Sequence, residues 1–599
     1  MENYCISRFN CVRLKTREVL AGGLGIGGDN PIRIQSMTNT KTMDVKASVA
    51  QCIQLAEAGC EIIRLTAQNL DAAKALKDIS KGFRAAGFQN PLVADIHFLP
   101  ATAMEAVEHV EKIRVNPGNF SDKKKTALVE YTDSQYAEEL DRVREKFAPL
   151  VKRCKELGRA MRIGTNHGSL SDRIISRYGD TPLGMVEAAL EFARICRDLS
   201  YNNFVFSFKA SNTKIMTATY RLAVKKMRAE GFDNPLHLGV TEAGFGLDAR
   251  IKSAIGIAGL LADGVGDTIR VSLTEDPVEE VPVAMEFVKI AERLRAEKAC
   301  PQIDEGLDFF SYSRRKSGAV EINGVKVGGD SVPSVAVFGK SQNAEFNFDS
   351  DGKCSGFKFA KPASAQELLN ELSSAEAVAA EIPADLLPEF AGAIRGAGGK
   401  IVVCPSAPQG GRHAVGEARA LAAGLKKLSI ACPVWLKFDA SKCVFPKGSE
   451  ESKLNEASAY IGSLLADGIG DIASVELSAN PERNAELALA ILQGARARKS
   501  KAEYVACPSC GRTLYNIQET AAAIKARTQH LKGLTIGIMG CIVNGPGEMS
   551  DADFGYVGGA PGKINLYKNK TCVKANIPQE QAIEKLIELI KESGKWVEP

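Results

Sequence analysis

Eight short runs of β-branched and apolar residues alternate with longer amphipathic stretches through the first half of the chain. The runs are 32–38, 61–66, 92–98, 112–116, 161–166, 204–209, 236–241 and 268–273. Segments between them, such as 45–58 and 183–199, carry apolar residues at helical spacing and are long enough for crossover helices. The alternation predicts an α/β fold that begins with a parallel (β/α)8 TIM barrel, in which chemistry takes place at the carboxyl ends of the strands.

Charged and polar side chains gather where these runs end. The set comprises Arg64, Asp95, His97, Arg114, Asn116, Arg162, Asn166, Lys209, Glu242, Arg270 and Ser272. Because parallel strands end at one rim of a barrel, five cations are expected to converge there. Each one alone can be a salt-bridged scaffold residue. Together they favour a strongly anionic ligand, such as one with two phosphoryl groups, since arginine forks match phosphate oxygens.

Three cysteines near the C-terminus have the spacing of a metal or cluster site. Cys507 and Cys510 form a C-x-x-C pair, and Cys541 opens a glycine-rich run that ends at Glu548. Three thiolates can hold an iron-sulfur cluster by three corners, with the Glu548 carboxylate covering the fourth. The spacing also suits a zinc site with Cys572 as fourth ligand, or an unliganded structural role. The glycines and proline after Cys541 favour a bulky group over zinc.

A repeated motif relates the middle of the chain to the barrel. The repeats are 260–267 with 464–471, and 27–29 with 328–330, in the same order. They lie closer together in the second copy, which predicts a contracted, degenerate barrel-like domain, with chance similarity of Gly-rich turns as the alternative. Aligning the longer repeat puts Ser474 opposite Arg270. It also puts Glu476 opposite Ser272, so we expect this region to be a noncatalytic spacer or brace.

Length and composition indicate several folded units. A chain of 599 residues exceeds the usual size of one core, and the stretches 300–316 and 495–501 have the composition of linkers. The expected domains are the barrel (1–300), the barrel-like insertion (305–495) and a small α+β domain that carries the cysteine motifs (500–599). In the last, strands are expected at 504–507, 534–539 and 563–567 and helices at 520–530 and 580–592.

Charge and hydropathy argue against two classes of partner. The formal net charge is only +4 and no long block of Lys or Arg occurs, which disfavours nucleic acid. Uncharged stretches are short and the start of the chain lacks an apolar core, which disfavours a membrane anchor or a leader. Fifteen cysteines, most of them within apolar runs, are typical of buried thiols in a reducing compartment. A cytoplasmic protein is therefore expected.

Two cysteine motifs and the opening strand resemble one enzyme family. The segments are Cys507-Pro508-Ser509-Cys510-Gly511-Arg512-Thr513, Gly540 to Glu548, and Pro31 to Thr40. Over nearly its whole length the chain is similar to the 4-hydroxy-3-methylbut-2-en-1-yl diphosphate synthase family of the methylerythritol phosphate route to isoprenoids, in its long three-domain form. The resemblance implies reductive ring opening and dehydroxylation of 2-C-methyl-D-erythritol 2,4-cyclodiphosphate to the linear allylic diphosphate.

The same resemblance implies roles for individual residues. It assigns a [4Fe-4S] cluster to Cys507, Cys510, Cys541 and Glu548, with Glu548 displaced by substrate and Cys572 a bystander. The implied substrate contacts are Arg64, Arg114, Arg162, Asn166, Lys209, Arg270 and Ser272. Glu242 is the implied acid, provided that burial raises its pKa despite the nearby cations. Ferredoxin or flavodoxin is the implied electron donor.

Other functions and one question of geometry stay open at this point. A zinc-stabilised scaffold that binds a phosphorylated ligand is the alternative function, and a different iron-sulfur lyase is a third. The barrel rim and the cysteine loops lie on separate domains, which must close on each other. In shorter family members the partner subunit supplies the lid, which keeps a homodimer among the expected states. We expect the contracted barrel here to position the C-terminal domain over the rim of its own chain.

Overall fold

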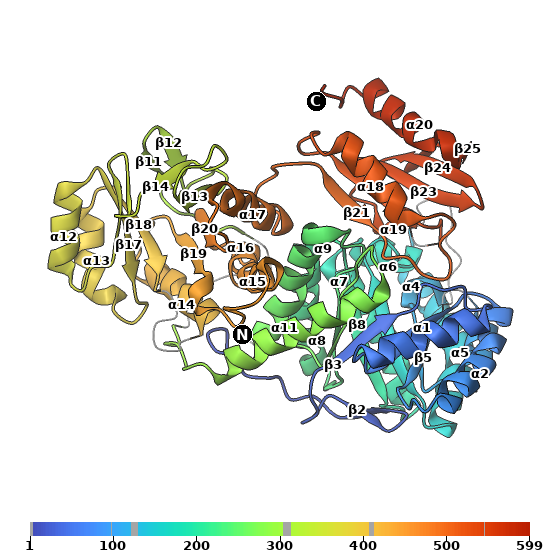
Figure 1. The fold of residues 1–599 in the computed structure, drawn as a ribbon. Coiled ribbons are helices and arrows are strands. Elements are labelled where there is room, and N and C mark those ends of the chain that lie inside the picture. Colours follow the sequence, from blue (N-terminus) through green and yellow to red (C-terminus); the bar gives the residue numbers. More distant parts are fainter. Residues whose placement is uncertain are drawn as a thin grey trace.

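The computed structural model describes residues 4–96, 99–120, 130–303, 313–406, 413–543 and 545–598. His97, Asn544 and most of the expected first linker lie outside the described residues. Figure 1 shows three regions: a barrel in blue and green, a middle region in yellow and orange at its side, and a C-terminal domain in red above the barrel. Within the described part of the chain, no helix has the length and apolar character needed to cross a membrane.

Eight parallel strands form the N-terminal barrel. Their order is β8-β7-β6-β5-β4-β3-β10-β9. The strands are β3 (Arg33–Met37), β4 (Ile62–Ala67), β5 (Leu92–Ile96), β6 (Lys112–Val115), β7 (Ala160–Asn166), β8 (Phe204–Lys209), β9 (His237–Leu238) and β10 (Thr268–Ile269). A parallel bridge between Phe206 and Leu236 joins the two ends of the sheet. The predicted TIM barrel is therefore confirmed.

Helices cover the outside of this barrel and begin where the sequence supplies a cap. They include α1 (Val45–Glu57), α2 (Leu70–Ala85), α3 (Pro100–Ala106), α5 (Asp133–Glu156), α7 (Pro182–Asp198), α8 (Thr213–Ala229), α9 (Gly246–Ser253), α10 (Gly259–Ala262) and α11 (Glu280–Ala296). The side chains of Asp44, Asn69 and Thr132 each accept a hydrogen bond from the backbone N–H three residues later. The apolar helix faces pack on the strands around fully buried Phe83 and Phe147.

The last two barrel strands are shorter than the predicted runs 236–241 and 268–273, and the segment that follows β9 contacts the C-terminal domain. Beyond β9 the backbone leaves the barrel ladder, and Glu242 adopts a positive φ of 51°. Ala243 then forms a parallel bridge with Ala506 of the C-terminal domain. The end of this barrel strand therefore belongs to the contact between two domains.

The middle region contains two four-stranded sheets, ordered β14-β13-β20-β19 and β15-β16-β17-β18. The strands are β13 (Ser334–Phe338), β14 (Phe346–Phe348), β15 (Lys353–Cys354), β16 (Phe357–Ala360), β17 (Ala377–Ile382), β18 (Ile401–Pro405), β19 (Trp435–Asp439) and β20 (Ile472–Glu476). A bridge between Val403 and Val434 joins the sheets. The helices include α14 (Ala414–Lys427), α15 (Glu450–Ala457), α16 (Ser463–Ala466) and α17 (Pro481–Gly494). The arrangement is an incomplete barrel.

Local details repeat between the two barrels beyond the sequence motifs. A hairpin precedes the first strand of each, β1 (Val19–Ala21) with β2 (Leu24–Ile26) and β11 (Val320–Ile322) with β12 (Val325–Val327). Arg13 Nη2 donates to Asp267 Oδ1 at 3.0 Å. Arg314 Nη2 makes the same contact with Asp471 Oδ1 at 2.6 Å. These shared contacts support the interpretation of the middle region as a contracted relative of the barrel.

Four buried charges join the two barrels through a pseudo-symmetric contact. Asp263 follows α10 and Asp467 follows α16, at corresponding places in the repeated motif. Arg221 of α8 lies 2.9 Å from Asp263 and 2.6 Å from Asp467. Arg419 of α14 lies 2.6 Å from Asp263 and 2.7 Å from Asp467. Each arginine thus binds the aspartate of its own barrel and that of the other, as in an isologous interface.

A five-stranded sheet forms the C-terminal domain, in the order β21-β22-β23-β24-β25. The strands are β21 (Glu503–Ala506), β22 (Thr535–Met539), β23 (Phe554–Ala560), β24 (Lys563–Lys568) and β25 (Thr571–Pro578), with helices α18 (Ile517–Thr528), α19 (Gly545–Glu548) and α20 (Gln579–Glu592). The first three strands are parallel and the last two antiparallel. The α+β prediction is confirmed, and β23 and β25 are strands that it did not include.

Candidate functional site

The C-terminal domain is docked on the rim of the N-terminal barrel of the same chain. Thr274 Oγ1 of the barrel donates a hydrogen bond to the carbonyl oxygen of Cys507 at 3.1 Å. Lys252 Nζ lies 3.0 Å from a carboxylate oxygen of Glu503, and both side chains are buried. With the Ala243 bridge described above, these contacts place the cysteine loops opposite the carboxyl ends of the barrel strands.

Glycines allow the two backbones to touch. A Cβ atom on Gly168 would lie 1.9 Å from the carbonyl oxygen of Gly547, and a Cβ on Gly547 would lie 2.2 Å from that of Gly168. A Cβ on Gly511 would lie 2.7 Å from the carbonyl oxygen of Thr40, in the loop after β3. Because no other residue lacks a Cβ, this close approach requires glycine at these positions.

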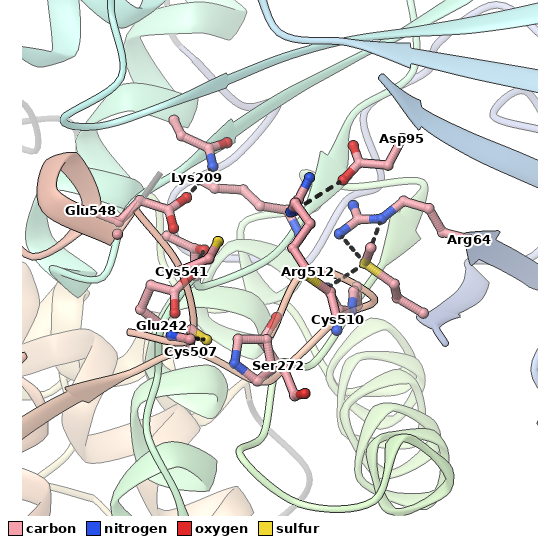
Figure 2. Close-up of a pocket in the computed structure, with 18 of the residues that line it drawn as sticks. Arg64, Asp95, Lys209, Glu242, Ser272, Cys507, Cys510, Arg512, Cys541 and Glu548 are labelled. Atoms are coloured by element: carbon pink, nitrogen blue, oxygen red, sulfur yellow. Dashed lines mark hydrogen bonds and ion pairs between the residues drawn. The ribbon is translucent and has the colours of Figure 1, made fainter. Parts of the chain in front are cut away.

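A cavity of about 690 Å³ lies between the two domains. The structure brings every residue assigned to substrate, acid or cluster to its walls, whereas Asn116 of the predicted rim set does not line the cavity. The assigned residues are Arg64, Arg114, Arg162, Asn166, Lys209, Glu242, Arg270 and Ser272 from the barrel and Cys507, Cys510, Cys541 and Glu548 from the C-terminal domain. Figure 2 shows labelled members of both sets facing the same space. The barrel strands thus supply the cations, and the C-terminal loops supply the sulfur atoms.

Three of the barrel cations have no carboxylate partner among the described residues. Arg64 donates from Nε and Nη2 to the sulfur of Met37, at 3.1 and 2.9 Å. Arg162 donates from Nη1 to Ser207 Oγ at 3.0 Å, while its Nε and Nη2 are buried without a partner. Lys209 is likewise buried without an ion pair in this part of the chain. Buried cationic donors left without an acceptor are costly, so the cavity is complementary to an anion.

The other two cations are oriented by buried carboxylates. Arg114 Nη1 donates to Asp95 Oδ1 at 3.0 Å, and its Nη2 donates to Asn166 Oδ1 at 3.2 Å. Arg270 Nη2 lies 3.1 Å from Glu280 Oε1. These contacts fix the direction of each guanidinium, and both side chains line the cavity.

Burial and mutual repulsion shift the pKa values of these cations. Burial, with repulsion from Arg270 and Arg114, lowers the pKa of Arg64 to about 10, although Asp95 opposes the shift. Burial and the surrounding guanidinium groups also lower the pKa values of Arg162 and Lys209. Both causes penalise the charged form, and a bound anion would relieve them.

Two carboxyl groups from different domains meet in the cavity. Burial, and then the proximity of Glu548, raise the pKa of Glu242, while a hydrogen bond from Thr241 opposes the shift. The sequence left open whether burial or the nearby cations would control the pKa of Glu242, and the effect of burial is the larger. The carboxylate of Glu548 accepts a hydrogen bond from Asn166 Nδ2. A protonated Glu242 beside an anion site is placed to donate a proton.

The three predicted cysteine ligands follow the ends of neighbouring strands. Cys507 and Cys510 lie after β21 and Cys541 lies after β22, and burial raises the pKa values of the Cys507 and Cys541 thiols. Within the described ranges, no three Cys, His, Asp or Glu side chains are gathered at metal-ligand geometry. Three thiols and one carboxylate nevertheless line a single cavity, and this donor set fits a cluster with one non-thiolate corner.

The structure does not bring together the four cysteines of the alternative zinc site. Cys572 lies exposed on β25, where its thiol contacts the carbonyl oxygen of Lys574. It does not line the cavity that Cys507, Cys510 and Cys541 share. The four-cysteine set considered from spacing therefore lacks its fourth member.

Sequence reasoning did not assign site roles to Met37 and Arg512. Met37 ends β3, and its sulfur contacts Arg64. Arg512 lies two residues after Cys510, and its Nη2 is 3.9 Å from Asp95 Oδ2 of the barrel. The available signal for Arg512 was its place in the C-x-x-C-G-R run, but only the docked structure puts it beside the barrel cations.

Two family models match the chain. The model described as the GcpE TIM-barrel domain matches residues 16–285, and the model described as the GcpE protein C-terminal domain matches residues 503–592. Among solved structures, a truncated 3-deoxy-D-arabino-heptulosonate 7-phosphate synthase from Thermotoga maritima is 13% identical and covers 47% of this chain and 94% of its own, with a TM-score of 0.32.

Full-length relatives carry one common name, 4-hydroxy-3-methylbut-2-en-1-yl diphosphate synthase (flavodoxin). The protein from Akkermansia muciniphila is 50% identical and covers 100% of this chain and 99% of its own. Those from Parabacteroides distasonis and Leptospira interrogans are 46% and 44% identical and cover 98% and 99% of this chain and 99% and 98% of their own. The chain therefore belongs to the 4-hydroxy-3-methylbut-2-en-1-yl diphosphate synthase family.

Proposed function

We propose that this chain reduces 2-C-methyl-D-erythritol 2,4-cyclodiphosphate to 4-hydroxy-3-methylbut-2-en-1-yl diphosphate, opening the ring and removing one hydroxyl group as water. The observation that carries the proposal is the meeting of unpartnered buried cations and three cysteines in one cavity. Membership of a family whose members are named for the product supports it. The charge of a cyclic diphosphate matches the excess of buried positive charge.

Substrate binding is assigned to the barrel rim. Arg64, Arg162 and Lys209 have donors or charge available for the phosphoryl oxygens, and Asp95 and Glu280 orient the partnered cations. The contacts assigned on this basis are Arg64, Arg114, Arg162, Asn166, Lys209, Arg270 and Ser272. Groups fixed before the substrate arrives need little reorganisation during the reaction, so the rim both positions the ring and neutralises its charge.

The electron-transfer group is assigned to the C-terminal loops. Cys507, Cys510, Cys541 and Glu548 would hold a [4Fe-4S] cluster, which supplies electrons one at a time when bound. Glu548 differs from the other three ligands in being a carboxylate, and Asn166 already donates a hydrogen bond to it. The barrel residue Asn166 would therefore orient the one carboxylate among the residues that would hold the cluster.

Glu242 is the proposed acid. Its carboxyl group is buried, and the raised pKa keeps it protonated when other carboxylates are ionised. The substrate hydroxyl that leaves needs a proton to depart as water, and Glu242 lies in the same cavity as the cations that hold the ring. Its role is general acid catalysis at that oxygen.

Flavodoxin is the proposed electron donor, with ferredoxin as the other candidate. The printed names of the relatives specify flavodoxin. A cytoplasmic location, without nucleic acid or membrane as partner, completes the proposal. Anaerobic turnover with each purified donor, compared at equal potential, separates the two, and cell fractionation tests the location.

The decisive experiment is anaerobic purification followed by iron, acid-labile sulfide and zinc analysis and by turnover of the cyclic diphosphate with a chemical one-electron donor. We expect a brown protein with about four irons per chain and formation of the linear diphosphate. A colourless protein with stoichiometric zinc and no turnover would instead favour the phospholigand-binding scaffold.

Closure within one chain is a further part of the proposal. One chain contributes all the cavity residues named above, and the middle barrel packs beside the first through the buried charges of Arg221 and Arg419. We infer that the middle barrel positions the C-terminal domain over its own rim, in place of a homodimer partner. Mixing a Cys507→Ala chain with an Arg270→Ala chain tests this, because restored activity means closure between chains.

A further inference from the structure

A layer of polar side chains lies inside the N-terminal barrel, beneath the cavity. Lys112 begins β6 and points to the same side of the sheet as Arg114, which lines the cavity two residues farther along the strand. Gln35 of β3 stands in the same relation to Met37. Farther down, an apolar cluster closes the barrel, and its members are Val19, Ala21, Ile26, Ile62, Val93, Ala160 and Val205. The layer is therefore enclosed between the cavity and an apolar floor.

Polar atoms of this layer are buried without hydrogen-bond partners among the described residues. They are Lys112 Nζ, His237 Nε2 of β9 and both amide atoms of Gln35. Lys112 and His237 are each 0% exposed. A buried ammonium group without an acceptor is costly, so this environment favours the uncharged amine of Lys112.

The charges around Lys112 act in the same direction as burial. Burial, with repulsion from Arg162 and Arg64, lowers the pKa of Lys112 to about 7. Burial and the same cations lower the pKa of His237, which therefore adds no charge to the layer near neutral pH. Arg64 and Arg162 are also two of the proposed phosphate contacts. A bound diphosphate would thus offset the two charges that disfavour a proton on Lys112.

We propose that Lys112 takes up a proton from solvent when the cyclic diphosphate binds above it, and so adds a positive charge to the occupied site. The inference rests on the proposed function and deepens it. Lys112 does not line the cavity, so it is a positioning residue that acts through Arg64 and Arg162. In the empty site the uncharged amine limits repulsion among buried cations, and in the occupied site its charge strengthens the hold on the anion.

The first test counts the protons taken up on binding. Oxidised holoenzyme is titrated calorimetrically with the cyclic diphosphate, without reductant, in buffers of different ionisation enthalpy, and iron and sulfide are measured in every sample. If bound anion raises the pKa of Lys112 by about one unit, the wild type should take up about half a proton more than Lys112→Met near pH 7.5. Wild-type affinity should be about tenfold higher near pH 6, and this difference should disappear towards pH 9, where Lys112 is uncharged in both states.

Two comparisons isolate the share of Lys112. Burial also lowers the pKa of Lys209, but a proton gained there is gained in the wild type and in Lys112→Met alike. The matched control is Lys77→Met on α2, an exposed lysine, which should leave proton uptake and affinity as in the wild type. Lys112→Gln replaces Lys112→Met in every comparison if the methionine variant fails to assemble its cluster.

The second test needs no substrate. Because the pKa of Lys112 is lowered, the folded state binds this proton more weakly than the unfolded state, and wild-type stability is lost as pH falls from 10.5 to about 7. In calorimetric scans of holoenzyme, the Tm of Lys112→Met should therefore rise relative to that of the wild type over this range. Lys77→Met should show no such change.

The outcomes separate this inference from the proposed function. A wild-type holoenzyme that does not bind the cyclic diphosphate overturns the function itself, whatever the Tm values show. Binding with equal proton uptake in the wild type and Lys112→Met overturns only the role of Lys112. A loss of affinity that is the same at every pH would mark a structural role and also overturns the inference. Greater uptake by the wild type, with an affinity difference that disappears at high pH, supports it.

Discussion

Each barrel has a cavity at the carboxyl ends of its strands, here called its mouth. The two mouths differ in whether their cations have carboxylate partners. In the first barrel, Arg64 and Arg162 reach the cavity without carboxylate partners among the described residues. In the middle barrel, a cavity of about 840 Å³ also lies at the carboxyl ends of strands, but its lysines are neutralised within the protein. Lys361 lies 3.1 Å from Glu381, and Lys437 lies 3.4 Å from Glu476. A related scaffold therefore keeps a pocket but loses its affinity for strong anions when each cation acquires its own partner.

The register of the strands allows the two mouths to be compared residue by residue. Asp267 N–H donates to the carbonyl oxygen of Leu236 in the first barrel, and Asp471 N–H donates to that of Val434 in the second. On this register the corresponding pairs are Glu242 with Ala440, Arg270 with Ser474 and Ser272 with Glu476. The second mouth thus lacks the proposed acid and one rim cation, which agrees with a bracing role.

The largest expected effect comes from removing the acid that only the first mouth has. Glu242→Gln should lower kcat about 10²- to 10⁴-fold, because the leaving hydroxyl loses its proton donor, while the Kd of substrate changes little. Single-turnover kinetics with reduced enzyme and calorimetry with oxidised enzyme measure the two effects. The control is Glu476→Gln in the second mouth, for which unchanged kcat is expected. Full activity of Glu242→Gln would remove the main chemical difference between the mouths.

At the contact between the two barrels, corresponding substitutions should have equal effects on stability. Asp263→Asn and Asp467→Asn each leave Arg221 and Arg419 with one buried carboxylate instead of two. Breaking such a pair typically costs about 3–5 kcal/mol. Both variants should therefore lower the Tm by similar amounts in calorimetric scans. A large effect of one and none of the other would show that this contact depends on one barrel alone.

Substrate affinity distinguishes the mouths by a smaller amount. Arg162→Met removes a buried guanidinium with unpartnered donors and should weaken binding of the cyclic diphosphate about ten- to a hundredfold. Lys361→Met, the matched change at the second mouth, should leave affinity as in the wild type. Equal losses in the two variants would place part of the binding site in the middle barrel.

The smallest expected effect is a pH-dependent change in stability that arises at the second mouth. Burial raises the pKa of Glu456 from near 4.5 to about 7, opposed by the N–H of Val444 and by Arg293. The folded state then binds the proton more tightly than the unfolded state, so the stability contributed by protonated Glu456 is lost as pH rises from 4.5 through 7. Glu456→Gln should match the wild type near pH 4.5 and have a higher Tm than the wild type above pH 7. A difference that does not vary with pH would contradict this assignment.

Much of the site could be predicted because each part depends on local sequence. The alternation of runs fixed the barrel, and residues that end parallel strands must share a rim, which placed Arg64, Arg114 and Arg162 together. The contact of Arg512 with Asp95 could not be predicted, since it joins a loop and a strand more than four hundred positions apart in the sequence. The early end of β9 was missed for the same reason, because its continuation pairs with Ala506 of another domain.

The touching main chains at Gly168 and Gly547 have a consequence for how this active site is inherited and engineered. One methyl group at either position would act as a wedge, since it would overlap a carbonyl oxygen of the opposite domain. Such a change would keep all the barrel cations and all the cysteines, but the two sets of side chains would lie farther apart. The absence of Cβ atoms at Gly168 and Gly547 therefore sets the distance between the barrel cations and the cysteine loops. Substitutions that changed only the charged residues would leave this distance unaltered.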